Sequence, residues 1–276
     1  CVTALVGAMS SGIAFADDLN IDGYSQEGAM GTYDNVNVDT SGDWHLPVQH
    51  GQVNITNKLT NNGTITNIAD IITNEIDNQS IITRNVNFGS LTINNGGNNS
   101  GTIDQRAIYV NGGTLTNNGT IEAGTFNNSG QLTGTGKLIA AGGSNSTTIE
   151  QNTIEITGNY TNNGTMTANK EFTNASSDIT GNGSLIIKDS TGNSSNGGSI
   201  SQAIVNISGN KFTNTGSITA SQEFTNSAAN LENNNTITSN GSFTNTGNIT
   251  GQGSISANQG GTNTGSMTQN EVTTGG

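Results

Sequence analysis

The side chains best suited to catalysis in this 276-residue chain are its acids and lysines, which are few and dispersed. Acid–base cleavage of a polysaccharide needs carboxylates that converge on one face. Glu171 and Glu223 occupy equivalent positions of a repeat, but neither has a second acid in register. The remaining charged candidates fall in different phases: Asp178, Asp189, Glu232, Lys137, Lys170, Lys188 and Lys211. We therefore expect that the protein is not an enzyme and uses no cofactor.

Metal-binding residue types are present near the N-terminus, without a metal-binding pattern. The acids there have no spacing that matches a calcium-binding EF-hand loop: Asp17, Asp18, Asp22, Asp34, Asp39 and Asp43. His45 and His50 lie five residues apart with no third ligand in register, and Cys1 is the only cysteine. A polar surface explains these residues, so we expect neither a metal site nor a disulfide framework.

Paired hydroxyl residues form a third chemical pattern. Serine or threonine flanks an isoleucine on both sides in three successive repeats: Ser217 and Thr219, Thr236 and Thr238, Ser254 and Ser256. A flat two-wide ladder of this kind is what ice-binding solenoids present. Exposed threonine is also an ordinary β-strand former. Ice binding is therefore one alternative function.

The elements that must position these side chains repeat at a fixed step. Between Phe212 and Thr268 the chain matches itself every 18–19 residues. Apolar residues return about every six positions, each flanked by polar ones, as expected for strands with one buried face. This spacing falls out of phase on an α-helix. The pattern predicts an all-β fold, a single parallel β-helix (β-solenoid) with three short strands per rung of 18–19 residues.

Three apolar core columns follow from this alignment. The first contains Phe212, Leu231, Ile249 and Met267; the second contains Ile218, Ile237 and Ile255; the third contains Phe224 and Phe243, with Gly261 at the next position. A longer repeat is also visible, because Tyr160–Asn174 recurs at Phe212–Asn226 with nine identities in fifteen residues.

A Thr-Asn-x-Gly motif separates the strands and predicts their corners. Its members are Asn61 and Gly63, Asn117 and Gly119, Asn162 and Gly164, Asn214 and Gly216, and Asn245 and Gly247. Asn and Gly tolerate the left-handed backbone of a sharp bend. Stacked asparagines are also expected to hydrogen-bond from rung to rung.

Composition agrees with a solenoid. Only 30% of residues are hydrophobic and 10% are charged, which suffices for one narrow core. The net charge of −13, with seven Lys and Arg, argues against nucleic acid as a partner.

Four segments are predicted along the chain. Residues 1–16 are apolar and read as a signal-peptide tail, a retained assembly strand or, less favoured, a segment lipidated at Cys1, with no membrane span in the mature protein. Residues 17–52 lack the corner motif and are predicted to cap the first rung. Residues 53–270 form the β-solenoid of about 12 rungs, with Gly/Ser/Asn-rich loops at 142–146 and 192–198, and residues 271–276 form a frayed end.

The units Leu-Thr-Asn-Asn-Gly-Thr-Ile and Ile/Leu-Thr-Gly-x-Gly-x-Ile/Leu, the latter at 132–138, 179–185 and 249–255, resemble the β-helical passenger regions of bacterial autotransporters and filamentous-haemagglutinin-like adhesins. The resemblance covers roughly residues 53–270. It implies a right-handed β-helix, secreted or on the cell surface, that builds a fibre or mediates adhesion. No C-terminal series of amphipathic strands for a membrane barrel follows.

We therefore expect a structural fibre subunit that stacks end to end with copies of itself. The residues expected at the joint are Val2, Leu5, Val6, Ile13, Phe15 and Met267. An adhesin stalk that binds surface glycans is the other alternative.

Overall fold

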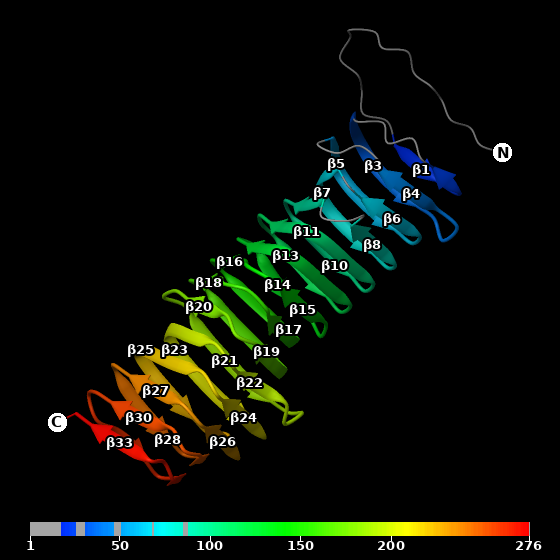
Figure 1. The fold of residues 1–276 in the computed structure, drawn as a ribbon. Helices are drawn as coiled ribbons and strands as arrows, with labels where there is room; N and C mark the ends of the chain where they lie inside the picture. The colour runs from blue at the N-terminus through cyan, green and yellow to red at the C-terminus, as the bar shows by residue number, and fades with distance from the viewer. Residues whose placement is uncertain (1–17, 26–30, 47–50, 68, 85–87, 276) are drawn as a thin grey trace.

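The fold is a single parallel β-solenoid of about 14 turns, which confirms the fold class predicted from the repeat. It comes from a computed structural model that describes residues 18–25, 31–46, 51–67, 69–84 and 88–275. Within these ranges there is no helix, and strands β1 to β33 pair in parallel from turn to turn (Figure 1). Strand β1 lies near one end of the rod and β33 at the other. Fourteen turns at about 4.8 Å each correspond to a rod about 65 Å long.

The strands are two to eleven residues long. The first half contains β1 (Leu19–Ile21), β2 (Tyr24–Ser25), β3 (Gly31–Val38), β4 (Asp43–Leu46), β5 (Gln52–Asn61), β6 (Thr64–Asn67), β7 (Asp70–Asn78), β8 (Ile81–Arg84), β9 (Ser90–Ile93), β10 (Gly96–Asn99), β11 (Thr102–Val110), β12 (Thr114–Asn117), β13 (Thr120–Asn128), β14 (Gln131–Thr133), β15 (Lys137–Ala140), β16 (Gly143–Asn145) and β17 (Thr148–Ile156). The second half contains β18 (Tyr160–Asn162), β19 (Thr165–Asn174), β20 (Asp178–Thr180), β21 (Ser184–Asp189), β22 (Ser194–Asn196), β23 (Ser199–Gly209), β24 (Lys211–Asn214), β25 (Ser217–Asn226), β26 (Asn230–Asn233), β27 (Thr236–Ser239), β28 (Ser242–Asn245), β29 (Asn248–Thr250), β30 (Ser254–Ala257), β31 (Gly261–Asn263), β32 (Ser266–Met267) and β33 (Glu271–Thr274).

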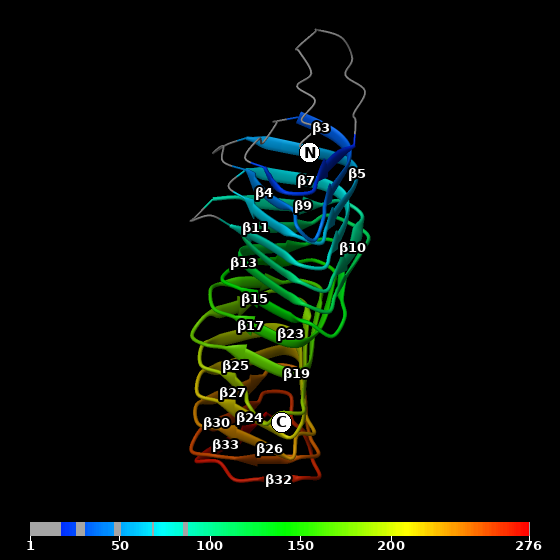
Figure 2. The ribbon, with the colours of Figure 1, turned by 90° about the vertical axis from the view of Figure 1, so that its right-hand side faces the viewer.

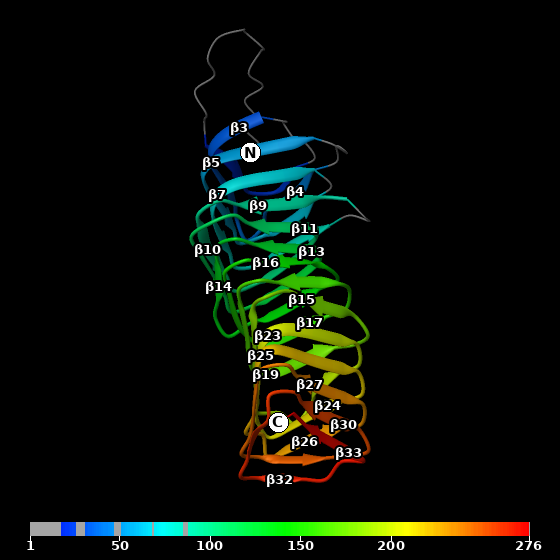
Figure 3. The same cartoon turned by 90° about the vertical axis from the view of Figure 1, so that its left-hand side faces the viewer.

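Successive turns wrap around one interior (Figures 2 and 3), which is filled by three rows of inward side chains. Row 1 contains Leu19, Val36, Leu59, Ile76, Gly97, Leu115, Leu132, Ile149, Met166, Leu185, Val205, Phe224, Phe243 and Gly261. Row 2 contains Val53, Ile71, Leu91, Ile108, Phe126, Gly143, Tyr160, Ile179, Ile200, Ile218, Ile237, Ile255 and Val272. Row 3 contains Trp44, Ile65, Ile82, Ile103, Ile121, Leu138, Ile154, Phe172, Ser194, Phe212, Leu231, Ile249 and Met267. The three apolar columns derived from the repeat are the C-terminal parts of these rows.

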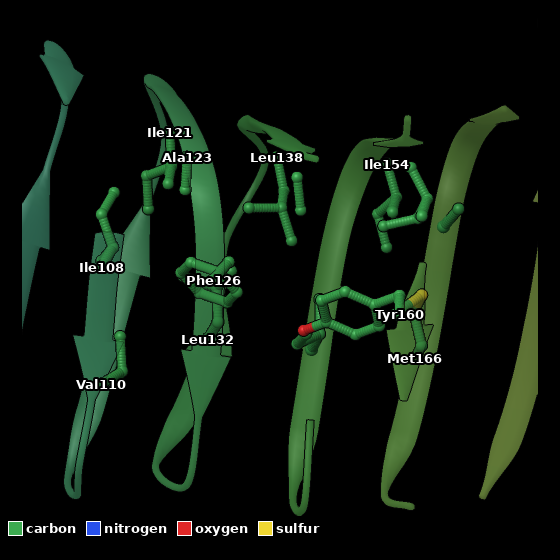
Figure 4. Close-up of a cluster of buried hydrophobic side chains, with 14 of the residues drawn as sticks. Ile108, Val110, Ile121, Ala123, Phe126, Leu132, Leu138, Ile154, Tyr160 and Met166 are labelled. Carbon is green, nitrogen blue, oxygen red and sulfur yellow. The ribbon is translucent and has the colours of Figure 1, made fainter. Parts of the chain in front are cut away.

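At two places in the core a small residue separates two aromatic rings, whereas Phe224 and Phe243 stack directly on each other in row 1 with ring centroids 5.5 Å apart. Gly143 stands between Phe126 and Tyr160 in row 2, and Ser194 stands between Phe172 and Phe212 in row 3. Figure 4 shows the buried rings of Phe126 and Tyr160 in this part of the core. Burial raises the pKa of the Tyr160 phenol, whose hydroxyl has no hydrogen-bond partner among the described residues. At both places, the small residue in the intervening turn makes room for the aromatic rings in the turns on either side.

The parallel stacking begins before residue 53. Strand β1 pairs with β3, β3 pairs with β5, and β4 pairs with β6. Val36 and Trp44 are fully buried in rows 1 and 3, so residues 19–25 and 31–46 belong to turns of the same solenoid. The boundary placed at residue 52 has no counterpart in the strand pairing, while a capping role for these first turns stays a prediction. At the other end, β33 pairs in register with β30, so the stacking continues through Thr274.

The two segments predicted as loops belong to the stack. Gly143–Asn145 forms β16, which pairs with β13 and β18, and Ser194–Asn196 forms β22, which pairs with β19 and β24. The prediction was wrong because both segments lack a large apolar residue. Their inward positions are held by Gly143 and Ser194, and neighbouring rings fill the space.

The corner glycines are needed for space and not for a left-handed backbone, which corrects the prediction from sequence. None of Gly63, Gly119, Gly164, Gly216 and Gly247 has a φ in the left-handed range. A Cβ atom on any of them would lie 1.9–2.2 Å from a carbonyl oxygen of the preceding turn. Backbones therefore approach too closely at these five glycines to leave room for a Cβ atom.

Gly119→Ala is expected to destabilise the rod by about 3 kcal/mol, because the added Cβ would lie 1.9 Å from the carbonyl oxygen of Gly101. Gly23→Ala is the matched control, since no atom of the described residues lies within 4 Å of its Cβ position. Urea unfolding followed by circular dichroism measures both. Equal stability of the two variants would contradict the steric explanation.

Candidate functional site: amide ladders and the final turn

The corner asparagines form hydrogen-bonded ladders inside the rod. Asn117, Asn162 and Asn214 are fully buried, and each sits at the end of a strand. Within a ladder, the Nδ2 of each asparagine donates to the Oδ1 of the asparagine one turn later, at 2.7–2.8 Å. The second Nδ2 hydrogen generally reaches a backbone carbonyl, such as that of Thr120 for Asn99. Buried amides are thus satisfied along the rod axis.

Four ladders succeed one another along the chain. Their members are Asn61, Asn78, Asn99 and Asn117; then Asn128, Asn145 and Asn162; then Asn174, Asn196, Asn214 and Asn233; and finally Asn226, Asn245 and Asn263.

The ladders do not all lie at the same corner of the rod. Corner A is the one that contains Asn61, corner B contains Asn162 and corner C contains Asn214. The strand register shows which residues occupy corner A in the turns after Asn117: Gly134, Gln151, Ala168, Ile187, Ile207 and Asn226. The second ladder therefore lies at corner B and the third at corner C. The repeat of Tyr160–Asn174 at Phe212–Asn226 consequently places one local structure at two different corners.

Three of the ladders end in the same arrangement, which combines a Gly-x-Gly turn with a glutamine one turn later. Gly134, Gly181 and Gly251 take the place of the next asparagine with φ angles of 120–127°. A glutamine one turn further on reaches past the glycine, and its Oε1 accepts the last Nδ2 of the ladder. The pairs are Asn117 and Gln151 at 2.7 Å, Asn162 and Gln202 at 2.8 Å, and Asn233 and Gln269 at 2.6 Å.

The turn itself is held by the residue after the last ladder asparagine. Asn118 Oδ1 accepts the backbone N–H of Thr135 at 3.1 Å, and Asn163 does the same for Asn182. The glycine leaves the space through which the glutamine side chain passes. These glutamines were missed from sequence, although each occupies the second position after an aliphatic residue, as in Ile200-Ser201-Gln202.

Gln202→Met is expected to cost about 1–2 kcal/mol, because it keeps the side-chain length and removes the acceptor for Asn162 inside the rod. Gln222→Ala, at an exposed position, is the control and should change stability by less than about 0.5 kcal/mol. Urea midpoints report both. A neutral Gln202→Met would show that the ladder terminus needs no acceptor.

One buried acid interrupts this uncharged interior. Asp189 is 1% exposed and closes the turn at residues 189–194. Its Oδ1 accepts Ser194 Oγ at 2.8 Å, and its Oδ2 accepts the backbone N–H of Gly192 at 2.8 Å and of Lys211 at 3.0 Å. Ser194 Oγ in turn accepts the N–H of Phe172. Burial alone would raise the pKa of Asp189, but these hydrogen bonds and one from Thr191 outweigh it and hold the pKa below 3.8.

Asp189→Asn is expected to lower stability at pH 7 by about 2 kcal/mol, because an amide cannot accept on both sides. Since the folded pKa lies below the ordinary value of 3.8, the carboxylate contributes fully above that value and loses its contribution as pH falls below it. The gap in urea midpoint between wild type and variant should therefore narrow below about pH 4. A gap that stays constant at acid pH would contradict this role.

The remaining charged groups lie apart along the rod surface. Ion pairs link Arg84 to Asp104 at 2.9 Å, Lys137 to Glu155 at 2.9 Å and Lys211 to Glu232 at 3.0 Å. A hydrogen bond from Asn234, together with Lys211, lowers the pKa of Glu232. Among the described residues no group of three or more His, Cys, Asp or Glu side chains could hold a metal ion.

The histidines and acids considered for metal binding from sequence do not form a cluster in the described residues either. His45 Nε2 pairs with Asp43 at 2.9 Å, while Cys1, Asp17 and His50 lie outside the described residues. No helix in the described part of the chain is long and apolar enough to cross a membrane.

The final turn leaves the inner rows uncovered. Val272, an inward member of row 2, is 48% exposed, and Met267 of row 3 is partly buried. Strands β31, β32 and β33 each pair with one strand of the preceding turn. The other residues predicted at the joint, Val2, Leu5, Val6, Ile13 and Phe15, lie outside the described residues.

Comparison with protein-family models, curated proteins and solved structures finds no match to this chain. The parallel β-solenoid agrees with the architecture implied by the resemblance to autotransporter and haemagglutinin-like passenger regions. Membership of those families stays without support from any comparison.

Proposed function

We propose that this chain is an exported, non-catalytic structural rod, the subunit of a fibre or sheath at a cell surface, whose copies stack end to end. The proposal rests on the continuous stack. In the described residues, strands β1 to β33 pair in parallel from turn to turn around rows of buried apolar side chains. A strand edge of such a stack is a template for another parallel turn supplied by a second copy.

The character of the rod supports this role. An interior that continues from turn to turn through the described strands, β1 to β33, suits a stiff spacer. The ion pairs are spread along the rod, and the largest group joins Arg84 to Asp104 and Glu122, which favours a structural role over catalysis. The net charge of −13 and the apolar residues 1–16 support export and a partner other than nucleic acid.

Purified protein examined by electron microscopy at increasing concentration is expected to form filaments with an axial repeat of about 65 Å, the height of one stack. Val272→Lys places a charge on the open end and should leave short rods. Ile81→Lys is the matched control, since Ile81 is 46% exposed on the side of the rod, and should still form filaments.

Monodisperse short rods of the unaltered protein at every concentration would overturn stacking. That result would favour the adhesin alternative, in which the rod is a stalk that binds surface glycans through its sides. Filaments of Val272→Lys with an unchanged repeat would place the joint elsewhere.

A further inference from the structure

One side of the rod carries an uninterrupted array of hydroxyl groups. In its central four turns the array is two residues wide, and each hydroxyl stands beside its equivalent in the next turn. The first column contains Ser199, Ser217, Thr236 and Ser254, and the second contains Ser201, Thr219, Thr238 and Ser256. The second column extends at both ends through Ser144, Thr161, Thr180 and Thr273, so that it spans eight successive turns. We call these twelve residues the hydroxyl face.

The central four turns of the hydroxyl face carry no charged side chain in either column, unlike the side of the rod on which the row 3 residues point inward. Lys137, Glu155, Lys211 and Glu232 flank row 3 residues and form ion pairs there. The first hydroxyl column is bounded by acids, because Asp178 precedes Ser199 and Glu271 follows Ser254 in register. A neutral surface of this kind selects a neutral ligand.

The hydroxyls are available to an external ligand. Of the twelve side chains, Ser144 alone makes a side-chain hydrogen bond within the described residues, to Asn127. All twelve are partly or fully exposed. The residues between the two columns, Ile200, Ile218, Ile237 and Ile255, are at most 1% exposed and anchor the strands to the core. The array is therefore rigid before it binds, which lowers the entropic cost of binding.

Its spacing suits a crystal more than a single soluble molecule. Hydroxyls repeat about 4.8 Å apart along the rod and about 6.8 Å apart across it, the distances between adjacent strands and between alternate residues. In a tetrahedral network with hydrogen bonds of about 2.8 Å, oxygens two bonds apart lie about 4.5 Å from each other. A row of hydroxyls on consecutive strands is thus close in period to a row of oxygens in solid water.

We propose that the hydroxyl face binds crystalline water. A crystalline polysaccharide is the competing surface. Sugar rings are held by aromatic platforms together with acid or amide side chains, and the twelve residues include no aromatic, acid or amide group. This inference does not depend on end-to-end stacking, since it uses the side of the rod.

The test is partition of fluorescently labelled protein into a slowly growing polycrystalline ice hemisphere, with thermal hysteresis as a second readout. The unaltered protein should be incorporated. Thr238→Lys and Thr219→Lys, at the centre of the face, should each reduce incorporation at least tenfold. Thr244→Lys is the matched control: it lies in the same turn as Thr238, outside the hydroxyl face, and should retain incorporation. Unchanged circular dichroism spectra would establish that all three variants fold.

Exclusion of the unaltered protein from ice would overturn the proposal. So would equal losses in Thr238→Lys and Thr244→Lys, because the face would then carry no specificity. Retention on microcrystalline cellulose or chitin, lost in Thr238→Lys, combined with exclusion from ice, would overturn it in favour of a polysaccharide surface.

Discussion

The structure depends on one constraint: every inward residue meets its counterpart in the next turn about 4.8 Å away. Parallel pairing from β1 to β33 enforces this contact along the whole rod. An apolar side chain satisfies it by packing, as in the rows that contain Leu231 and Ile237. A buried amide satisfies it by a hydrogen bond to another turn, usually the adjacent one, since water has no access. Asparagine therefore occurs inside the rod in runs.

A run of asparagines has two ends, and each end leaves one polar atom without its usual neighbour. At the start, Oδ1 of Asn61 and of Asn128 has no hydrogen-bond partner in the described part of the chain. At the finish, the Gly-x-Gly turn lets a glutamine such as Gln202 reach the last Nδ2. The unpartnered oxygens of Asn61 and Asn128 cost stability, whereas the first oxygens of the other two ladders, on Asn174 and Asn226, each accept a backbone N–H at 3.2 Å. The glutamine avoids the cost at the finish. The ladders stop at one corner and restart at another. Together they form a narrow line of hydrogen-bonded amides inside an otherwise apolar core.

The same constraint shapes the outside of the rod. Outward residues also stack in register. A residue type that recurs at one position of the repeat therefore forms a regularly spaced column on the surface. On one side this produces the hydroxyl face around Thr219 and Thr238, and on another it produces isolated ion pairs such as Lys211 with Glu232. The proposed binding surface is therefore a direct product of the repeat.

The sequence by itself determined the solenoid, its strand alternation and the columns that contain Phe212, Ile218 and Phe224, because apolar periodicity is local information. It also marked the corner asparagines and predicted their hydrogen bonds from rung to rung, which the ladders confirm. Only the tertiary structure decided where each ladder ends and why the corner glycines are needed. The contacts that matter join residues 17 to 40 positions apart, such as Asn162 and Gln202, and no local pattern specifies which turn a side chain reaches. Gly119 needs its missing Cβ because of the carbonyl of Gly101 one turn away, and Gly143 and Ser194 are interior residues because rings in adjacent turns fill their space. Proximity between turns is a property of the stack, and it appears only when the turns are placed on one another.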